Sequence, residues 1–483
     1  MSAARVMFVE PPPTVDWQPD SGLSTGGRRH PSTSVTGEQV YSYYNLSAAA
    51  VLREQGHEVF YIHCQTEGIS LKDLEEKISA ISPHFLVIMV EHISLSASLE
   101  TAKIAGRMGI KIIFVGPMAT AFDDQMIDSG ADYIVRGEWD WTLNNLVTAL
   151  AEDAELSTVK GVSYKNNGSL VRNEIAELID DLDKLPMPAY DLVDLSKFWE
   201  SIFLYRPTAT VVSSRGCPYE CIFCSFPQTI FSREFRVQSP ERVLAEAKYL
   251  KEKFGVKAIR YDDDTFDVDN KRTRRICELF IKEKLGLKWM IQSRPNLMTE
   301  EIARMLKKAG CHLVVFGIET SDDDILKKIK KGTTKTDMVK GFNNARKAGL
   351  EIFNCIMLGF YWDTKESIER TYKFACDLNA EFTEFSIPIP LPGTEYYEFL
   401  KDKDCFRSSK WEDFNSFHSA NQDLPNFSNE YINEKIRKCY RYYYLRPKYL
   451  TRMLSVSLTS FAKMKRFIRL ITAYGKRWLK GWI

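Results

Sequence analysis

Short apolar runs alternate with amphipathic helical stretches along most of this chain of 483 residues, and this alternation limits its fold more than any other feature. The first set of apolar runs is RVMFVE (5–10), EVFYIH (58–63), FLVIMV (85–90), KIIFVG (111–116) and YIVRG (133–137). Helical stretches such as LSAAAVLREQG (46–56) separate them. Strands that alternate with helices are typical of parallel sheets. We therefore expect a doubly wound, Rossmann-like α/β domain over residues 1–152.

A second alternation begins at residue 208 and supplies six further strands. They are TATVVSSRG (208–216), AIRYDDDTF (258–266), KWMIQSR (288–294), HLVVFGIET (312–320), EIFNCIMLGF (351–360) and EFTEFSIPIP (381–390). Helices are expected between them, for example over 240–255 and 300–310. Six strand–helix units predict a partial, open (β/α)6 TIM-type barrel over residues 205–400, with its site at the carboxyl ends of the strands. Residues 153–204 are expected to form a connector with a small hairpin at 161–173, and residues 401–483 a helical, basic region.

Composition narrows the classes of protein that the chain can belong to. Lys and Arg total 65 and Asp and Glu 64, and this balance argues against a dedicated nucleic-acid-binding protein. The sequence holds no uncharged apolar stretch long enough to span a membrane, and its amino terminus leads straight into the first expected strand rather than into a signal-peptide core. We therefore expect a cytoplasmic protein.

The loops that follow the strands of the first domain do not resemble a dinucleotide site. Parallel sheets bind ligands at the carboxyl ends of their strands, which here carry EPPPTVD, EHISLSAS, GPMAT and GEWD. None of these loops is a GxGxxG turn, and the first has three prolines where a dinucleotide fold needs glycines. The sequence argues against NAD or FAD and favours a different flat or bulky ligand.

Three of the ten cysteines lie within eight residues, directly after the first expected barrel strand. Cys217, Cys221 and Cys224 form the CxxxCxxC segment CPYECIFC, whereas the other seven are far apart and suit reduced, mostly buried thiols. Thiolates favour zinc, copper(I) or iron–sulfur clusters. A structural zinc site would need a fourth protein ligand, and no second CxxC or nearby His supplies one. A four-iron cubane held by three cysteines keeps one iron open for another ligand.

This segment resembles the radical S-adenosylmethionine (SAM) superfamily, which uses CxxxCxφC with an aromatic φ, here Phe223. The resemblance implies a [4Fe-4S] cluster on the three cysteines and SAM on the open iron, whose reductive cleavage gives a 5′-deoxyadenosyl radical. It also implies SAM contacts at residues that end the barrel strands. Those that we carry over are Phe223, Asp263, Arg294 and Glu319.

Other interpretations of these residues stay open. A solvated turn would also explain the run Asp262–Asp264, and a charge favoured by a helix dipole would explain Glu319. The fifth loop departs from the glycine–proline form that is common in the superfamily, because Phe360, Tyr361 and Trp362 stand there. This departure bears on the substrate rather than on the cluster.

A doubly wound domain before such a barrel resembles the cobalamin-binding subgroup of the same superfamily. In that subgroup the corrin lies over the carboxyl ends of the strands and faces the barrel. The positions that we carry over as cobalamin-binding are Ser94, Ser96, Gly116, Pro117, Gly137 and Glu138. The DxHxxG motif of some cobalamin proteins is not intact, because Tyr61 stands where the aspartate would be, so we interpret His63 as an ordinary strand-end histidine. A domain that has lost the cofactor is the alternative.

The last forty residues, 444–483, contain ten Lys or Arg and no Asp or Glu. They mix these charges with Leu, Ile, Phe and Trp at roughly helical spacing, as in a basic amphipathic helix on an anionic membrane surface. The alternative is a helix packed over the barrel mouth with its basic face in water. No nucleic-acid-recognition module accompanies the charge.

The resemblance implies a cobalamin-dependent radical SAM methyltransferase that acts on an unactivated carbon of a small-molecule or lipid-like substrate. The adenosyl radical would remove a hydrogen atom and methylcobalamin would deliver the methyl group. An electron donor such as flavodoxin or ferredoxin is expected, and no nucleic acid. The alternative enzyme is a radical oxidative cyclase, since the domain order also resembles the anaerobic magnesium-protoporphyrin IX monomethyl ester cyclase. A non-catalytic metal-binding or light-sensing cobalamin protein is the alternative from another class.

Overall fold

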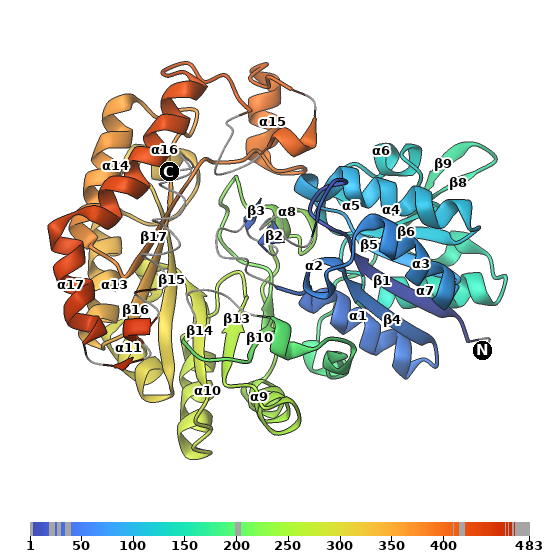
Figure 1. The fold of residues 1–483 in the computed structure, drawn as a ribbon, viewed down its shortest axis with the longest axis horizontal. Coiled ribbons are helices and arrows are strands. Elements are labelled where there is room, and N and C mark those ends of the chain that lie inside the picture. The colour runs from blue at the N-terminus through green and yellow to red at the C-terminus, as the bar shows by residue number, and fades with distance from the viewer. Residues whose placement is uncertain are drawn as a thin grey trace.

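Two parallel sheets covered by helices lie side by side along the long axis of the molecule (Figure 1). This computed structural model describes residues 3–18, 25–26, 30–33, 40–198, 204–408, 410–414, 421–458, 460–461, 463–465 and 468. The first sheet belongs to the amino-terminal part of the chain and the second to the middle part. The predicted α/β fold, with a doubly wound domain, a partial barrel and a helical carboxyl-terminal region, is confirmed.

The first sheet has seven strands in the order β4-β1-β5-β6-β7-β8-β9. Their bounds are β1 Arg5–Glu10, β4 Glu58–His63, β5 Phe85–Met89, β6 Lys111–Val115, β7 Tyr133–Val135, β8 Val162–Asn166 and β9 Ser169–Arg172. The helices around it are α1 Tyr43–Glu54, α2 Cys64–Glu67, α3 Leu71–Ile81, α4 Leu95–Arg107, α5 Pro117–Ala121, α6 Asp123–Asp128 and α7 Asp140–Ala151. The apolar runs become strands because a sheet with helices on both faces buries both sides of each strand. The direction of winding reverses between β1 and β5, and ligands of such sheets bind at this switch point.

The hairpin of β8 and β9 extends the first sheet instead of standing apart in a connector. β7 and β8 pair antiparallel, with Val135 opposite Val162. The hairpin joins the sheet because β7 would otherwise leave its backbone groups unpaired at the edge.

The second sheet has six parallel strands in the order β10-β13-β14-β15-β16-β17. Their bounds are β10 Thr208–Val211, β13 Ala258–Tyr261, β14 Lys288–Ser293, β15 Cys311–Glu319, β16 Glu351–Met357 and β17 Phe382–Ser386. Its helices are α8 Ser225–Thr229, α9 Pro240–Phe254, α10 Asn270–Lys282, α11 Glu300–Lys308, α12 Asp323–Lys328, α13 Lys335–Lys347, α14 Lys365–Leu378 and α15 Glu395–Asp402. Two small ribbons complete the strands, β2 Thr25–Gly26 with β3 His30–Thr33, and β11 Ser214–Arg215 with β12 Arg236–Val237. Within the described residues β10 and β17 do not pair, so the barrel is open.

Tyrosine hydroxyls cover both edges of the open barrel. At the β10 edge the Tyr41 hydroxyl donates to the Thr210 carbonyl at 3.0 Å and accepts from its amide at 2.8 Å. At the β17 edge the Tyr444 hydroxyl donates to the Thr383 carbonyl at 2.8 Å and accepts from its amide at 2.9 Å. An uncovered edge strand offers unpaired backbone groups to other chains. The amino-terminal domain and the carboxyl-terminal helices therefore each supply hydrogen-bond partners to one edge strand of the barrel.

The carboxyl-terminal helices α16 (Asn429–Leu445) and α17 (Pro447–Ser457) lie against β17 and the segment before it. The Tyr449 hydroxyl donates to the Glu381 carbonyl at 2.9 Å, and the Arg446 guanidinium donates to the Asn379 side chain at 2.6 Å. These contacts are at the amino-terminal end of β17. The alternative of a tail helix over the barrel mouth is therefore wrong for α17, whereas the start of α16 does lie at the carboxyl end of the barrel, where Ile432 packs against Gly359 after β16. The tail tryptophans Trp478 and Trp482 lie outside the described residues.

No helix among the described residues is both long enough and apolar enough to cross a membrane.

A buried ion-pair network joins the amino-terminal domain to the barrel. The Arg215 guanidinium contacts Asp140 at 2.7 Å and Glu138 at 3.1 Å, and Arg236 contacts Glu138 at 2.7 Å. The Ser47 hydroxyl adds a 2.5 Å hydrogen bond to Asp140. The ion-paired side chains are at most 8% exposed, so water does not screen the charges.

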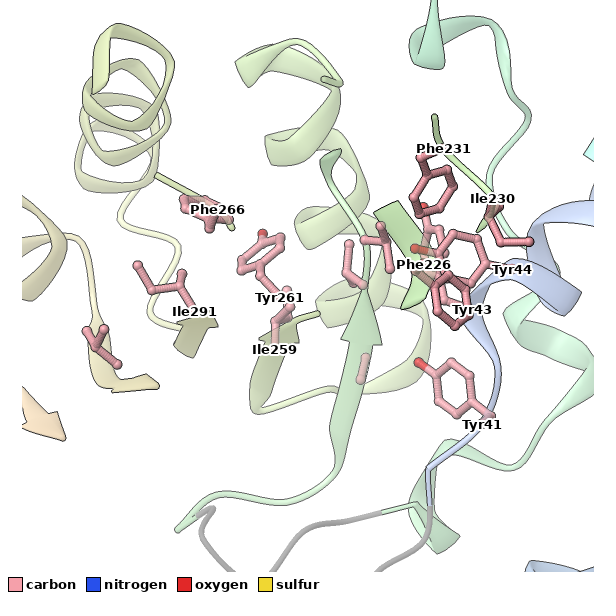
Figure 2. Close-up of a cluster of buried hydrophobic side chains, with 14 of the residues drawn as sticks. Tyr41, Tyr43, Tyr44, Phe226, Ile230, Phe231, Ile259, Tyr261, Phe266 and Ile291 are labelled. Atoms are coloured by element: carbon pink, nitrogen blue, oxygen red, sulfur yellow. The ribbon is translucent and has the colours of Figure 1, made fainter. Parts of the chain in front are cut away.

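An aromatic cluster lies beside this network, with Arg215 over the Tyr44 ring and Arg236 over the Phe231 ring. Tyr41, Tyr43 and Tyr44 enter from the amino-terminal domain (Figure 2), and Tyr44 meets Phe226 and Phe231 of the barrel. The Tyr44 ring stacks on Phe226 with ring centres 5.7 Å apart. The interface between the domains is thus apolar around a charged centre.

We predict that Arg215→Ala lowers the free energy of unfolding by about 3–5 kcal/mol, because Glu138 and Asp140 would keep buried charges with one cation fewer. Guanidinium unfolding would measure the change. The matched control is Arg275→Ala, since Arg275 contacts Glu241 at 3.0 Å while both side chains are at least half exposed. That control should cost less than about 1 kcal/mol. Equal losses in the two variants would contradict the role assigned to the network.

Candidate active site

The cysteine loop leaves the barrel through a glycine that no other residue can replace without distortion. Gly216 follows β11 with φ of +80°, a conformation that side chains disfavour. A Cβ atom on Gly216 would lie 1.9 Å from the Glu234 carbonyl oxygen. This close approach fixes where Cys217 begins the loop.

Two of the three cysteine thiols point toward the carboxyl ends of barrel strands. The Cys217 sulfur lies 3.5 Å from the Thr265 hydroxyl, in the loop after β13. The Cys221 sulfur lies 3.6 Å from the Arg294 guanidinium, which follows β14. Cys217 and Cys221 are buried and Cys224 is partly exposed. Burial raises the pKa of the Cys217 thiol, so metal binding there must displace a proton.

Gln228 of α8 holds the shape of the cysteine loop. Its side-chain amide donates to the carbonyls of Cys221, Ile222 and Cys224 at 3.3, 3.1 and 2.7 Å. Its oxygen accepts from the Glu395 amide at 3.0 Å and so links the loop to α15. The loop backbone is therefore fixed by the protein itself.

The cysteine loop offers three thiols to a metal centre. Within the described residues no three His, Cys, Asp or Glu side chains form a group that could hold one metal ion. The other seven cysteines are free thiols, as expected. Three thiols in one loop suit a four-iron cluster with one open iron.

The structure brings Arg294 and Glu319 together beside the cysteine loop. Arg294 lies over the Tyr219 ring at 3.6 Å and donates to the Lys331 carbonyl. The Lys331 ammonium donates to the Glu319 carboxylate at 2.7 Å. Glu319 has φ of +61°, and its second oxygen is buried without a hydrogen-bond partner in the described part of the chain. A strained residue with an unsatisfied acceptor suits a polar ligand group such as the ammonium or hydroxyls of SAM.

Phe223 forms an apolar wall with the aromatic fifth loop. Its ring centre is 5.7 Å from that of Phe360, which in turn lies 5.8 Å from Tyr396. The Asp363 carboxylate accepts from the Phe360 amide at 2.9 Å and holds the loop in place. The bulky fifth loop therefore packs on the cysteine loop rather than opening into solvent.

Asp263 does not join the other predicted SAM residues. It is fully buried and accepts hydrogen bonds from the Ser213 hydroxyl, at 2.9 Å, and from the Ser214 hydroxyl. Burial raises its pKa, and the nearby Arg272 acts against this shift. Asp263 therefore braces the strand that leads to the cysteine loop, and a solvated turn is wrong for it because the two serines enclose it.

A pocket lies between the two sheets at the switch point of the first. It is lined on one side by Glu10, Glu91 and Ser94 and on the other by Thr210, Val212 and Asp262. Of the predicted cobalamin residues only Ser94 lines it, while Ser96 is partly exposed on α4. The carboxyl ends of β1 and β5 thus face the carboxyl ends of β10 and β13 across this pocket.

The other predicted cobalamin residues follow β6 and β7. Gly116 has φ of +98° and precedes Pro117, the first residue of α5. The Gly137 amide donates to the Thr120 hydroxyl at 3.1 Å. Glu138 is instead engaged by Arg215 and Arg236, so its carboxylate holds the domains together. Gly137 leaves the backbone open to close approach by a ligand, because no atom of the described residues beyond its chain neighbours lies within 4 Å of where its Cβ would be, whereas the Met89 side chain lies 3.0 Å from that position on Gly116.

His63 has no nitrogen left for a metal. Its Nε2 lies 3.3 Å from the Glu10 carboxylate and 3.1 Å from the Val40 carbonyl, and its Nδ1 accepts from the Thr66 amide at 3.2 Å. The ion pair with Glu10 helps to raise the pKa of His63 despite its burial. This agrees with an ordinary strand-end histidine.

Sequence reasoning missed several residues that build the site. Arg215, Lys331 and Gln228 carry no motif that would have singled them out. The tyrosines at 41, 43 and 44 did offer a signal, because three aromatic residues in so short a run need a packing partner. Their partners come from the other domain.

The comparisons with known proteins agree with this geometry. Residues 211–375 match the radical SAM superfamily and residues 38–147 match the B12 binding domain. The chain is 34% identical to an uncharacterized methyltransferase of Pyrococcus horikoshii, over 83% of this chain and 87% of that protein. It is 27% identical to the hopanoid C-3 methylase of Methylococcus capsulatus, over 72% and 66% of the two chains. It is also 27% identical to the anaerobic magnesium-protoporphyrin IX monomethyl ester cyclase of Rubrivivax gelatinosus, over 74% and 65%.

Solved structures share the fold. OxsB, a cobalamin-dependent SAM radical enzyme, matches with a TM-score of 0.73 and 16% identity, over 96% of this chain and 72% of that one. The radical SAM methyltransferase TsrM of Kitasatospora setae matches with a TM-score of 0.66 and 17% identity, over 83% and 75%.

The chain therefore belongs to the radical SAM superfamily and is an enzyme. Within the superfamily it stands in the subgroup with an amino-terminal B12 binding domain, whose cofactors are a [4Fe-4S] cluster, SAM and cobalamin.

We predict that Glu91→Gln changes stability in a pH-dependent way. Burial, with the nearby Glu10 carboxylate, raises the pKa of Glu91 to about 8. The folded protein then keeps a proton that the unfolded chain loses above about pH 4.3, so this residue makes the protein less stable as the pH rises from there to about 8. The glutamine cannot ionise. The melting temperature of the variant minus that of the native protein should therefore rise as the pH increases across this window. A difference that stays constant with pH would contradict the prediction.

Proposed function

We propose that this protein is a cobalamin-dependent radical SAM methyltransferase that acts on an unactivated carbon of a small-molecule or lipid-like substrate. The observation that carries the proposal is the pocket between the two sheets, which both the cobalamin-type switch point and the carboxyl ends of the barrel strands line. The methyltransferase names among the relatives support it. When bound, the cofactors would supply hydrogen abstraction and a methyl group.

The residues of the chain would bind and orient the cofactors and would exclude water from them. Cys217, Cys221 and Cys224 would hold the cluster, while Arg294 and Glu319, linked through Lys331, would contact SAM. The aromatic cluster between the domains would keep solvent out of the pocket (Figure 2).

Ser94, Gly116 and Gly137 would meet the corrin at the carboxyl edge of the first sheet. Ser96 and Pro117 are proposed to contact the corrin as well, whereas Glu138 would act indirectly, through the ion pairs that place this edge opposite the barrel.

The proposed domains are residues 1–152, 153–204, 205–400 and 401–483. The hairpin of the second segment is attached to the first sheet.

Two partners belong to the proposal. A flavodoxin or ferredoxin would supply the electron that SAM cleavage requires. Contact with a membrane is a separate proposal, because it rests on another part of the chain.

The cyclase is the second candidate, since relatives from three organisms carry that name. The two reactions differ in their products from SAM. Methyl transfer yields S-adenosylhomocysteine together with 5′-deoxyadenosine, whereas cyclisation yields only the latter. Protein loaded with cluster and cobalamin, then reduced and supplied with its substrate as methyl acceptor, should form both products from SAM, and a lack of S-adenosylhomocysteine during turnover would favour the cyclase.

We predict that Cys217→Ala abolishes the formation of 5′-deoxyadenosine from SAM under reducing conditions, because the cluster loses one of its three protein ligands. Anaerobic reconstitution should load about four irons per chain in the native protein and far fewer in the variant. The control is Cys376→Ala, a partly exposed thiol on α14, which should keep both iron and cleavage. Cleavage that survives in Cys217→Ala would overturn the radical SAM assignment of this loop.

A further inference from the structure

An exposed apolar stripe runs along α17 and the residues after it. Leu454, Leu458 and Phe461 are 50%, 72% and 87% exposed. Leu454 and Leu458 are four residues apart, which places them on one face of the helix, and Phe461 follows the end of α17. The Leu458 amide donates to the Leu454 carbonyl at 3.0 Å, which keeps the helical pattern at the end of α17. We call these three residues the carboxyl-terminal stripe.

The opposite face of α17 is fixed to the barrel. Tyr449 and Met453 are buried, and the Arg452 guanidinium donates to the Asn379 carbonyl and pairs with the Glu381 carboxylate. Figure 1 shows α17 at the outer side of the barrel, away from the amino-terminal domain. Leu454 is therefore held outward by a firmly packed helix, and Leu458 and Phe461 follow directly after it.

The charged residues of the carboxyl-terminal segment have one sign. Residues 444–483 contain ten Lys or Arg and no Asp or Glu. Lys448 and Lys465 are exposed on the described part of this segment. The acidic partners of Arg452 and Lys463 are Glu381 and Glu351, which come from the barrel. The segment itself contributes cationic, apolar and neutral polar side chains but no acidic one.

We propose that the carboxyl-terminal stripe docks on an anionic membrane surface. Leucine and phenylalanine would enter the boundary between headgroups and acyl chains, and each nearby Lys or Arg would add about 1 kcal/mol by attraction to anionic lipid. Cores of protein interfaces are depleted in lysine, so a protein partner fits this mixture less well. A nucleic acid would leave the apolar stripe without a function.

The position of the stripe separates this proposal from the proposed chemistry. Glu351 opens β16, and Asn379 and Glu381 precede β17, so the contacts of this segment mark the amino-terminal end of the barrel strands. The cysteine loop lies at the carboxyl end. Membrane docking would therefore anchor the enzyme from the far side of its pocket, and it does not require a lipid substrate.

The test is flotation of the full-length protein with vesicles of pure phosphatidylcholine and with vesicles that also contain phosphatidylglycerol. We expect binding to the anionic vesicles, weakened by salt, and little binding to the neutral ones. The variant Leu454→Ser, Leu458→Ser, Phe461→Ser should reduce binding by about tenfold or more, because the inserted apolar area is lost. Ile175→Ser is the matched control, since Ile175 is 73% exposed in the amino-terminal part of the chain.

A second variant, Lys448→Glu with Lys465→Glu, keeps the stripe and should also weaken binding to anionic vesicles. Absence of flotation in the native protein, or equal flotation of the native protein and both variants, would overturn the proposal. So would a dimer in light scattering that the triple serine variant abolishes without any lipid effect, because the stripe would then bind a second copy. Cleavage of SAM in solution should be unchanged in the serine variant, so failure here and failure of the proposed function give different results.

Discussion

The open edge of the barrel is the constraint on which the arrangement of the whole chain depends. Six parallel strands do not close on themselves, and both outer strands carry backbone groups that need partners. Tyr41 from the amino-terminal domain satisfies Thr210 on β10, and Tyr444 from α16 satisfies Thr383 on β17. Because each edge is covered by a different end of the chain, the barrel brings the flanking regions to fixed positions. The pocket between the sheets follows from this arrangement.

The ion pairs around Arg215 place the cysteine loop relative to the first domain. Arg215 lies two residues before Cys217, and it contacts Glu138 and Asp140 directly after β7 and at the start of α7. A buried charge network tolerates little displacement, since separated partners would stay desolvated and uncompensated. The start of the cysteine loop and the carboxyl edge of the first sheet are thereby held in a fixed relative position. Chemistry that needs two cofactors to meet one substrate requires such fixed spacing.

Much of the fold and part of the site could be predicted from residues that act locally. The six barrel strands and the five parallel strands of the first sheet follow from apolar periodicity, because burial on both faces leaves a continuous apolar run. Arg294 and Glu319 were named from the family resemblance, and the structure places Arg294 beside the Cys221 thiol and links it to Glu319 through Lys331, while their contact with SAM stays a prediction. Asp263 was assigned to SAM, and its carboxylate instead accepts from the Ser213 and Ser214 hydroxyls between β10 and the cysteine loop. The hairpin of β8 and β9 joined the first sheet. Both cases depend on neighbours that sequence spacing does not reveal.

The sequence by itself determined the class of the enzyme, since the spacing of Cys217, Cys221 and Cys224 after a strand is a local property. Only the tertiary structure decided which distant groups meet. Tyr41 and Thr210 are 169 residues apart, and Arg215 and Asp140 are 75 apart. Such contacts depend on how the two folded sheets pack against each other. From the sequence alone, many other residues of similar chemistry could equally well be the partners. The chemistry of the loop is therefore encoded locally, while its position against the first domain is a result of packing.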